Sequence, residues 1–101
     1  MKHYTKPDQR LMATWAADCA ARVLPLFEQA YPADERPRQA IAACRNWVRT
    51  GVFTMAAIRG ASLAAHAAAR AAAANPAASF AARAAGQAVA TAHVPQHAFG
   101  S

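Results

Sequence analysis

Residues 64–93 read AAHAAARAAAANPAASFAARAAGQAVATAH, and this stretch decides the fold class. Asn75 and Pro76 divide it, because Asn is a favoured helix N-cap and Pro is favoured at the first helical position. Most of the other residues are Ala, the strongest helix former. The stretch therefore predicts two helices joined by a short turn. One ends near Ala74, and the next runs from Pro76 to about His93.

These two helices carry Ala on almost every inward position. Small side chains allow two helix axes to approach to the short end of the usual range of about 8–10 Å. We therefore predict a close, antiparallel, Ala-packed pair. The large side chains of the first half of the chain should stack against it, namely Trp15, Phe27 and Trp47.

A first helix is expected from Gln9 to about Ala30, with Asp8 as its N-cap. Pro25 lacks a backbone donor, so it should kink this helix near residues 21–23 or separate its final turn. The large apolar residues recur at spacings of three and four, which predicts one buried stripe. Its members are Met12, Trp15, Cys19, Val23, Leu26 and Phe27.

A second helix should follow Asp34 as its cap and end near Thr50, where Gly51 suits the C′ position. Thr54 should cap a third helix that begins at Met55. The second helix should bury Ile41, Cys44, Trp47 and Val48. With no strand pattern in the sequence, we predict an all-α fold: an antiparallel bundle of four main helices, in one domain over residues 8–101 after a flexible leader over residues 1–7.

The charge balance points to an anionic partner. Eleven basic residues against five acidic ones give a net charge of +6, which suits an acidic protein, nucleic acid or an anionic membrane surface. The candidate partner-binding residues are Arg36, Arg38, Arg45 and Arg49. No aromatic residues alternate with them and no nucleic-acid module is apparent, so we favour a solvated basic face over phosphate binding.

The apolar pattern indicates a cytoplasmic protein without a membrane segment. Residues 1–10 lack the apolar run of a signal peptide, and His66 and Arg70 interrupt the long Ala stretch. Cys19 and Cys44 lie within apolar helical patterns. We interpret both as reduced core thiols rather than as a disulfide.

A polar interhelical cluster is the nearest approach to a chemical site, and its candidates are Asp18, Arg22, His66, Arg70, His93 and His97. His66 and His93 could bind a metal or carry a proton between the last two helices, but hydrogen-bonded structural histidines are the interpretation we favour. His93 and His97 have the spacing of paired metal ligands on a helix, yet Pro95 interrupts that helix and no third ligand is obvious.

Asp18 and Arg22 lie four residues apart on one helix. They could form a helix ion pair, Asp18 could accept from an Arg of another helix, or Asp18 could be a perturbed catalytic acid. No nucleophile motif or phosphate-binding glycine loop is present. The sequence therefore predicts a protein that is not an enzyme, with no catalytic residue, no metal and no cofactor.

Three stretches carry a family resemblance: ATWAADCAARVLPLFEQAYPADERPRQAI (residues 13–41), AAHAAARAAA (residues 64–73) and AARAAGQAVATAHVPQHAFGS (residues 81–101). Together they resemble the putative immunity protein family of bacterial polymorphic toxin systems, whose members are all-helical with Ala-rich second halves. The residues that match the family pattern are Trp15, Asp18, Cys19, Pro25, Phe27, Glu28, Tyr31, Pro32, Arg36, Pro37, Trp47, His66, Arg70, Gly86, His93 and His97.

The resemblance implies a non-catalytic protein that neutralises a toxin by covering or distorting it. Because the face of this chain is positive, the cognate toxin should present an acidic surface, which argues against blockage of a cationic nuclease cleft. Two departures stand out. Gln87 follows Gly86 where similar proteins often have His, and the chain stops at Ser101 where relatives continue with a further helical segment. A shortened chain would fit the second departure, and so would a short form that pairs with another copy as a homo-oligomer.

Overall fold

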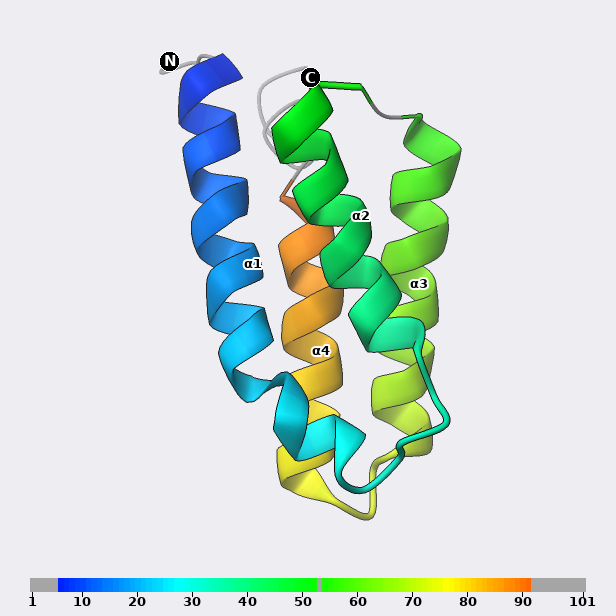
Figure 1. Cartoon of the computed structure of the whole chain (residues 1–101). Coiled ribbons are helices and arrows are strands. Elements are labelled where there is room, and N and C mark those ends of the chain that lie inside the picture. The colour runs from blue at the N-terminus through cyan, green and yellow to red at the C-terminus, as the bar shows by residue number, and fades with distance from the viewer. Residues whose placement is uncertain (1–5, 53, 92–101) are drawn as a thin grey trace, which may run out of the picture.

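Four helices that alternate in direction make up the fold (Figure 1). The computed structural model describes residues 6–52 and 54–91, with side chains from Asp8 onward. The helices are α1 (Lys6–Glu28), α2 (Arg36–Thr50), α3 (Met55–Ala71) and α4 (Pro76–Ala90). Within these ranges there is no strand. The prediction of an all-α bundle of four main helices is confirmed.

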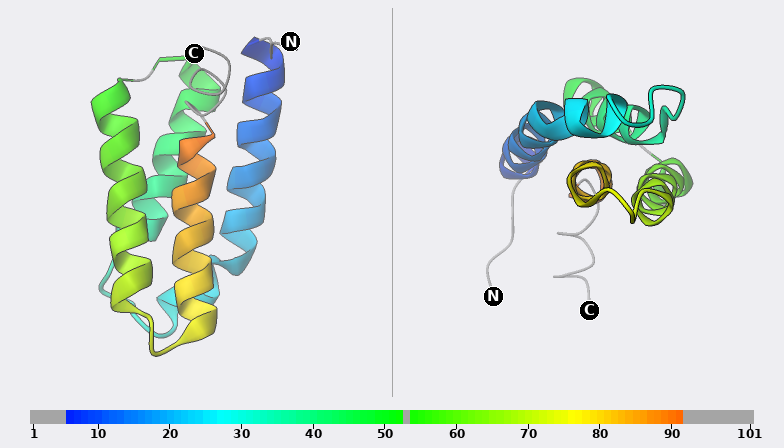
Figure 2. Two further views of the ribbon diagram at one scale, coloured as in Figure 1. Left: turned by 180° about the vertical axis from the view of Figure 1, so that it is seen from behind. Right: turned by 90° about the horizontal axis from the view of Figure 1, so that it is seen from below.

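Helix α4 is the centre of the arrangement. It packs against α1, α2 and α3, whereas α2 is the neighbour of both α1 and α3. Seen along the bundle, α1, α2 and α3 form an arc around α4 (Figure 2). As a result α1 and α3 lie on opposite sides of α4, and one side of α4 is not covered by the arc.

Three of the predicted helix boundaries follow from local capping chemistry. The side chains of Thr54 and Asn75 accept hydrogen bonds from the backbone N–H groups of Ala57 (3.2 Å) and Ala78 (3.1 Å), as N-caps do. Gly51 adopts φ 72°, and its N–H donates to the carbonyl of Trp47 at 2.7 Å. That left-handed conformation favours Gly, which explains why α2 ends there.

Four boundary predictions are wrong in detail, and one of them is the end of α4, which lies at Ala90 and not near His93. Helix α1 begins at Lys6, so Asp8 lies in its first turn instead of capping it. There its carboxylate still complements the positive end of the helix dipole. The N-cap of α2 is Glu35 without a side-chain bond, while Asp34 accepts from the N–H of Arg36 at 3.1 Å. Helix α3 ends at Ala71, three residues earlier than expected.

Pro25 lies inside α1, as predicted, and the last turn of α1 bends away from the rest of the helix in Figure 1. The bend is expected because Pro25 cannot donate to the preceding turn and its ring crowds the carbonyl there. Glu28 ends the helix, so the bent turn carries this carboxylate into the region between α1 and α2.

The α3–α4 pair is packed through small residues, as expected. Fully or nearly buried alanines line the contact from both helices: Ala65, Ala68, Ala69, Ala78, Ala81, Ala82 and Ala85. Ser79 Oγ donates to the carbonyl of Ala69 at 2.8 Å, and Ser62 Oγ donates to the carbonyl of Gly86 at 3.1 Å. Such bonds from short side chains to the facing backbone require the two helices to lie close together. Phe27 and Trp47 pack onto this core as predicted.

The prediction for α1 fails on the face that it buries. The buried residues are Ala13, Ala17, Ala20, Leu24 and Phe27. Of the predicted stripe only Phe27 is buried, whereas Trp15 is 73% exposed and Met12, Cys19 and Leu26 are also exposed. A second stripe, of small residues at the same spacing, sits beside the predicted one. It faces α4 because alanines allow the closer approach.

The two cysteines have opposite environments and form no disulfide. Cys44 is fully buried, and its Sγ donates toward the carbonyls of Ala13 at 3.5 Å and Ala88 at 3.3 Å, which links α2 to α1 and α4. Burial raises the pKa of the Cys44 thiol to about 11. The interpretation as a core thiol is therefore correct for Cys44 and wrong for Cys19, which is exposed.

Candidate partner-binding surface

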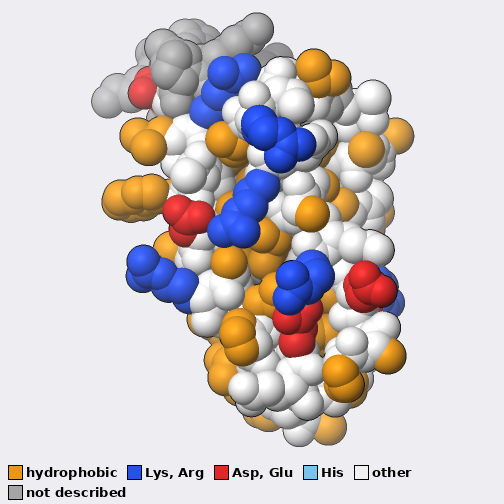
Figure 3. All heavy atoms as spheres, viewed as in Figure 1, with side chains coloured by type: hydrophobic (Ala, Val, Ile, Leu, Met, Phe, Trp, Pro, Cys, Tyr) orange, Lys and Arg blue, Asp and Glu red, His pale blue; other side chains and the backbone are white. Residues whose placement is uncertain are grey.

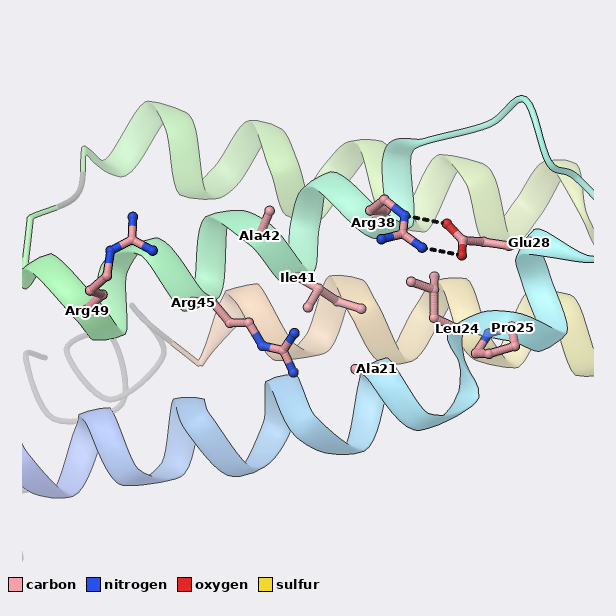
Figure 4. A pocket seen from close by; sticks show the side chains of 9 residues that line it. All are labelled: Ala21, Leu24, Pro25, Glu28, Arg38, Ile41, Ala42, Arg45 and Arg49. Carbon is pink, nitrogen blue, oxygen red and sulfur yellow. Dashed lines mark hydrogen bonds and ion pairs between the residues drawn. The ribbon is translucent and has the colours of Figure 1, made fainter.

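The face formed by α1 and α2 carries a row of basic side chains with a few acidic ones among them (Figure 3). A groove of about 430 Å³ runs between the two helices. Its lining residues are Ala21, Leu24, Pro25 and Glu28 of α1 with Arg38, Ile41, Ala42, Arg45 and Arg49 of α2 (Figure 4). We call this feature the basic groove.

Helical spacing explains why these residues meet. Arg38, Ile41, Arg45 and Arg49 are three or four residues apart, so they share one side of α2. Leu24 and Ile41 are buried and form an apolar floor, and the guanidinium groups stand above it. The groove therefore combines an apolar base with a cationic rim.

Arg38 is held by Glu28 across the lower end of the groove. Its Nε donates to Oε2 at 2.7 Å and its Nη2 donates to Oε1 at 2.6 Å, the bidentate geometry that suits guanidinium and carboxylate. The hydrogen bond from Arg38 lowers the pKa of Glu28. The charge of Arg38 is thus largely paired with a carboxylate of the same chain, Glu28.

The side chains of Arg45 and Arg49 are held by fewer and weaker contacts than that of Arg38. Arg45 Nη2 donates to Asp18 Oδ1 of α1 at 3.1 Å, and both side chains are about half exposed. Arg49 Nη2 donates to the neutral amide oxygen of Asn46 at 2.8 Å. Because exposed ion pairs are weak and a neutral amide leaves the charge intact, both guanidinium groups can be transferred to carboxylates of a partner.

Two more arginines flank this region differently. The guanidinium of Arg10 in α1 lies against Gly51 at the C-terminal end of α2, where a cation is favourable. Arg36, the first residue of α2, makes a bidentate pair with Asp34 at 2.9 and 2.7 Å, and the hydrogen bond from Arg36 lowers the pKa of Asp34. Of the four predicted partner-binding arginines, Arg38, Arg45 and Arg49 thus line one groove and Arg36 does not.

Of the predicted polar interhelical cluster, the four residues that the structure describes do not come together at one place. Asp18 accepts from Arg45 and not from Arg22, which was one of the alternatives that the sequence left open. Asp18 and Arg22 belong to α1, on the other side of α4 from His66 and Arg70 of α3. His93 and His97 lie outside the described residues.

His66 does lie at the α3–α4 contact. It is half-buried, and a Cβ built on Gly86 would come within 2.8 Å of its Nε2. Gly86 therefore leaves the space that this imidazole occupies. Arg70 is exposed near the end of α3. No group of three His, Cys, Asp or Glu residues suited to a metal ion exists among the described residues.

Sequence reasoning missed Glu28 and Arg10 as parts of the basic surface, and it allowed Asp18 an arginine of another helix without naming Arg45. Their contacts join α1 to α2, and the spacing of residues within one helix cannot predict such contacts. The one available signal in the sequence was that Asp18 and Glu28 are the only acidic residues in the second half of α1. Sequence reasoning also placed Trp15 in the core, where it is not.

The fold and this surface define a class: an all-α protein with a strongly basic face between two of its helices. The comparisons name the family. A family model described as "Imm-5 like putative immunity protein" matches residues 2–101, so the chain belongs to this family. No curated protein and no solved structure gives a significant match. Across the described helices, none is long and apolar enough to cross a bilayer.

Proposed function

We propose that this protein neutralises a toxin by binding an acidic surface of that toxin through the basic groove. Family membership supports the role of an immunity protein. The observation that carries the assignment to this face is the pair Arg45 and Arg49, whose guanidinium groups are exposed and only weakly held beside an apolar floor. Such a rim can offer bidentate bonds to carboxylates while the floor accepts an apolar side chain.

The mechanism needs no catalytic group. On binding, a partner carboxylate replaces Asp18 on Arg45, and a second one takes Arg49 from Asn46. Electrostatic attraction between the basic face and an acidic partner accelerates the encounter, and the desolvated guanidinium pairs then slow dissociation. The bidentate pair of Arg38 and Glu28 keeps its geometry and serves as a fixed edge of the groove.

A nucleic-acid ligand is the alternative that the arginines raise. The carboxylates of Glu28 and Asp18 stand on the same face, and they would repel a phosphate backbone. The apolar floor also provides no polar group that could bind a phosphate. Both features favour a protein partner.

The test is capture of the partner from host lysate by the tagged chain and by two charge-matched variants. Arg45→Glu/Arg49→Glu reverses two charges in the groove, while Arg59→Glu/Arg70→Glu reverses two exposed charges on α3. We expect the wild type and the α3 variant to capture one acidic toxin domain that survives nuclease treatment, and the groove variant to lose it. Co-expression should then restore growth of toxin-producing cells with the first two proteins only.

Equal capture by both variants would move the binding face away from the groove. Capture that disappears on nuclease treatment, with a steep dependence on salt, would instead assign a nucleic-acid ligand.

A further inference from the structure

The acidic residues of this chain are confined to its first part, since all five lie between Asp8 and Glu35. Helices α3 and α4 therefore contain no carboxylate side chain, but they carry three exposed arginines: Arg59, Arg70 and Arg83. No hydrogen bond or ion pair joins these three side chains to another residue that the structure describes. The charge of these two helices is thus both positive and unpaired.

The two arginines of α3 lie on the side of that helix that meets α4. Four polar residues at spacings of three and four share this side: Arg59, Ser62, His66 and Arg70. Ser62 Oγ donates to the carbonyl of Gly86 at 3.1 Å, and the His66 ring occupies the space beside Gly86. Arg59 precedes these two contact residues along α3, and Arg70 follows them.

Arg83 lies on the matching side of α4. Ser79, four residues before it, donates through Oγ to the carbonyl of Ala69 at 2.8 Å. Gly86, three residues after it, accepts from Ser62. Arg83 is therefore placed between two points of contact with α3.

These side chains reach solvent on the outward side of the α3–α4 contact. Helix α2 packs against both α3 and α4, so it covers the inward side. Seen from behind, α3 and α4 stand in front of α2 (Figure 2), whereas the basic groove opens on the α1–α2 face. We call Arg59, Arg70 and Arg83, together with His66, the arginine seam. It lies on the face opposite the basic groove.

The arginine seam has the form of a phosphate-binding track. Arg59 and Arg70 are eleven residues apart, which is about 16 Å along α3 at a rise of about 1.5 Å per residue. A line of clustered cations is the electrostatic footprint of a protein that binds a phosphate backbone. Guanidinium groups suit this ligand because each can donate two hydrogen bonds to one phosphate. Unlike the basic groove, this face has no carboxylate from its own two helices to repel phosphates.

Two large apolar side chains stand on the outer edges of the arginine seam. They are Phe80 of α4, which is 55% exposed, and Leu63 of α3, which is 62% exposed. Phe80 comes three residues before Arg83, so its ring lies beside the seam, where a base can stack on it. An interfacial membrane helix has a continuous apolar face with its cations on the polar side, and here the cations occupy the middle. The face also has no protruding element that could enter the groove of a duplex.

We propose that the arginine seam binds the phosphate backbone of a single-stranded nucleic acid, with one base stacked on Phe80. Because the seam and the basic groove lie on opposite faces, binding at one leaves the other open. This inference does not rest on the proposed function. In the capture experiment above, loss of nucleic acid from the α3 variant and loss of a protein from the groove variant are separate results.

The test is fluorescence anisotropy with a labelled oligothymidine of about 12 nucleotides, a length within the range of single-strand binding sites. The full chain should bind it with a Kd of about 1–100 µM at about 0.15 M salt, as expected for non-specific phosphate contacts. Arg59→Glu/Arg70→Glu should weaken binding by at least about tenfold, because two phosphate contacts become repulsive. Arg45→Glu/Arg49→Glu changes the net charge equally but should weaken binding by less than about threefold, because charges beyond about 8 Å are screened at this salt.

Two further variants separate the charges from the ring. Arg83→Gln removes one phosphate contact, so it should reduce the slope of log K against log salt by about 0.7. Phe80→Ala should weaken binding by at least about fivefold and leave that slope unchanged, because stacking releases no counterion. Leu63→Ala removes an exposed apolar side chain from the other edge and should bind like the wild type. Thermal melting of every variant checks that it still folds.

Equal losses in the seam and groove variants would mean that binding follows the net charge alone, and they would overturn the proposal. So would unchanged binding by Phe80→Ala, or a wild-type chain that does not bind at about millimolar oligonucleotide. Vesicles of phosphatidylserine and phosphatidylcholine supply the other anionic surface. If they bind through the same arginines and the oligonucleotide does not, the seam is a membrane-binding face and the proposal is wrong.

Discussion

The two halves of this protein use opposite ways of filling space. In α3 and α4 alanines fill the contact, and two Ser hydroxyls reach across to the facing backbone. In α1 and α2 the residues are larger, but only some of the large side chains point inward: Trp47 is 5% exposed and Trp15 is 73% exposed. A closely packed Ala core can therefore leave large apolar residues on the surface.

The reason lies in the position of α4. Because α4 is nearly all Ala on the sides that it buries, every neighbouring helix can approach it closely. Helix α1 meets it through Ala13, Ala17 and Ala20. A Trp at that contact would hold the two backbones apart and would lose packing along the whole helix.

The two tryptophans give the largest contrast. Trp47→Ala should destabilise the fold by about 3–5 kcal/mol, because it removes a large side chain from the core. Trp15→Ala should change the free energy of unfolding by no more than about 0.5 kcal/mol in dilute protein, since its side chain is mostly exposed. Urea unfolding of both variants measures the difference. Equal losses would mean that Trp15 belongs to the core.

Larger side chains in the Ala-packed contact between α3 and α4 should destabilise the fold. Ala68→Leu and Ala85→Leu insert bulk at two fully buried positions and should each destabilise by about 1–3 kcal/mol. Ala77→Leu, at an exposed position of α4, is the matched control and should be nearly neutral. Two silent core substitutions, measured by the same denaturant titration, would show that α3 and α4 have room between them.

The thiol that joins α1, α2 and α4 should make stability depend on alkaline pH. An unfolded cysteine loses its proton near pH 9, whereas buried Cys44 keeps it up to about pH 11. Its contribution is therefore complete below pH 9 and declines by about 1.4 kcal/mol per pH unit between pH 9 and 11. Cys44→Ala should remove this part of the decline in melts recorded across that range. An identical decline in both proteins would assign it to other groups.

Two helical glycines give the smallest effect and test how tight the α3–α4 contact is. A Cβ at Gly60 of α3 would meet nothing within 4 Å, so Gly60→Ala should stabilise by up to about 1 kcal/mol through helix propensity. A Cβ at Gly86 would meet the His66 ring at 2.8 Å, so Gly86→Ala should lose that gain or destabilise.

The double variant Gly86→Ala/His66→Ala serves as the control for this contact. Relative to His66→Ala alone, the added methyl should stabilise by about as much as Gly60→Ala does, because the ring is gone. If Gly86→Ala stabilises the wild-type protein as well, the imidazole moves aside freely and the contact is loose. Thermal unfolding resolves these differences.

The candidate site was predictable in part. Arg38, Arg45 and Arg49 share one helical side by spacing alone, and the sequence identified them as a surface. Their carboxylate partners could not be assigned from spacing, because Glu28 and Asp18 come from a different helix and depend on the bend at Pro25 and on the angle between α1 and α2. How many hydrogen bonds Arg45 and Arg49 can still donate is thus decided by the packed structure.

By itself the sequence determined the four helices and three of their ends, because capping is local chemistry. Thr54, Asn75-Pro76 and Gly51 satisfy or release backbone groups within a few residues of themselves. Only the tertiary structure decided which side of α1 is buried. That helix carries two apolar stripes of equal spacing, and hydrophobicity favours the larger residues while backbone approach to α4 favours the alanines. Packing against a small-residue partner chose the alanines, and it left Trp15 on the surface.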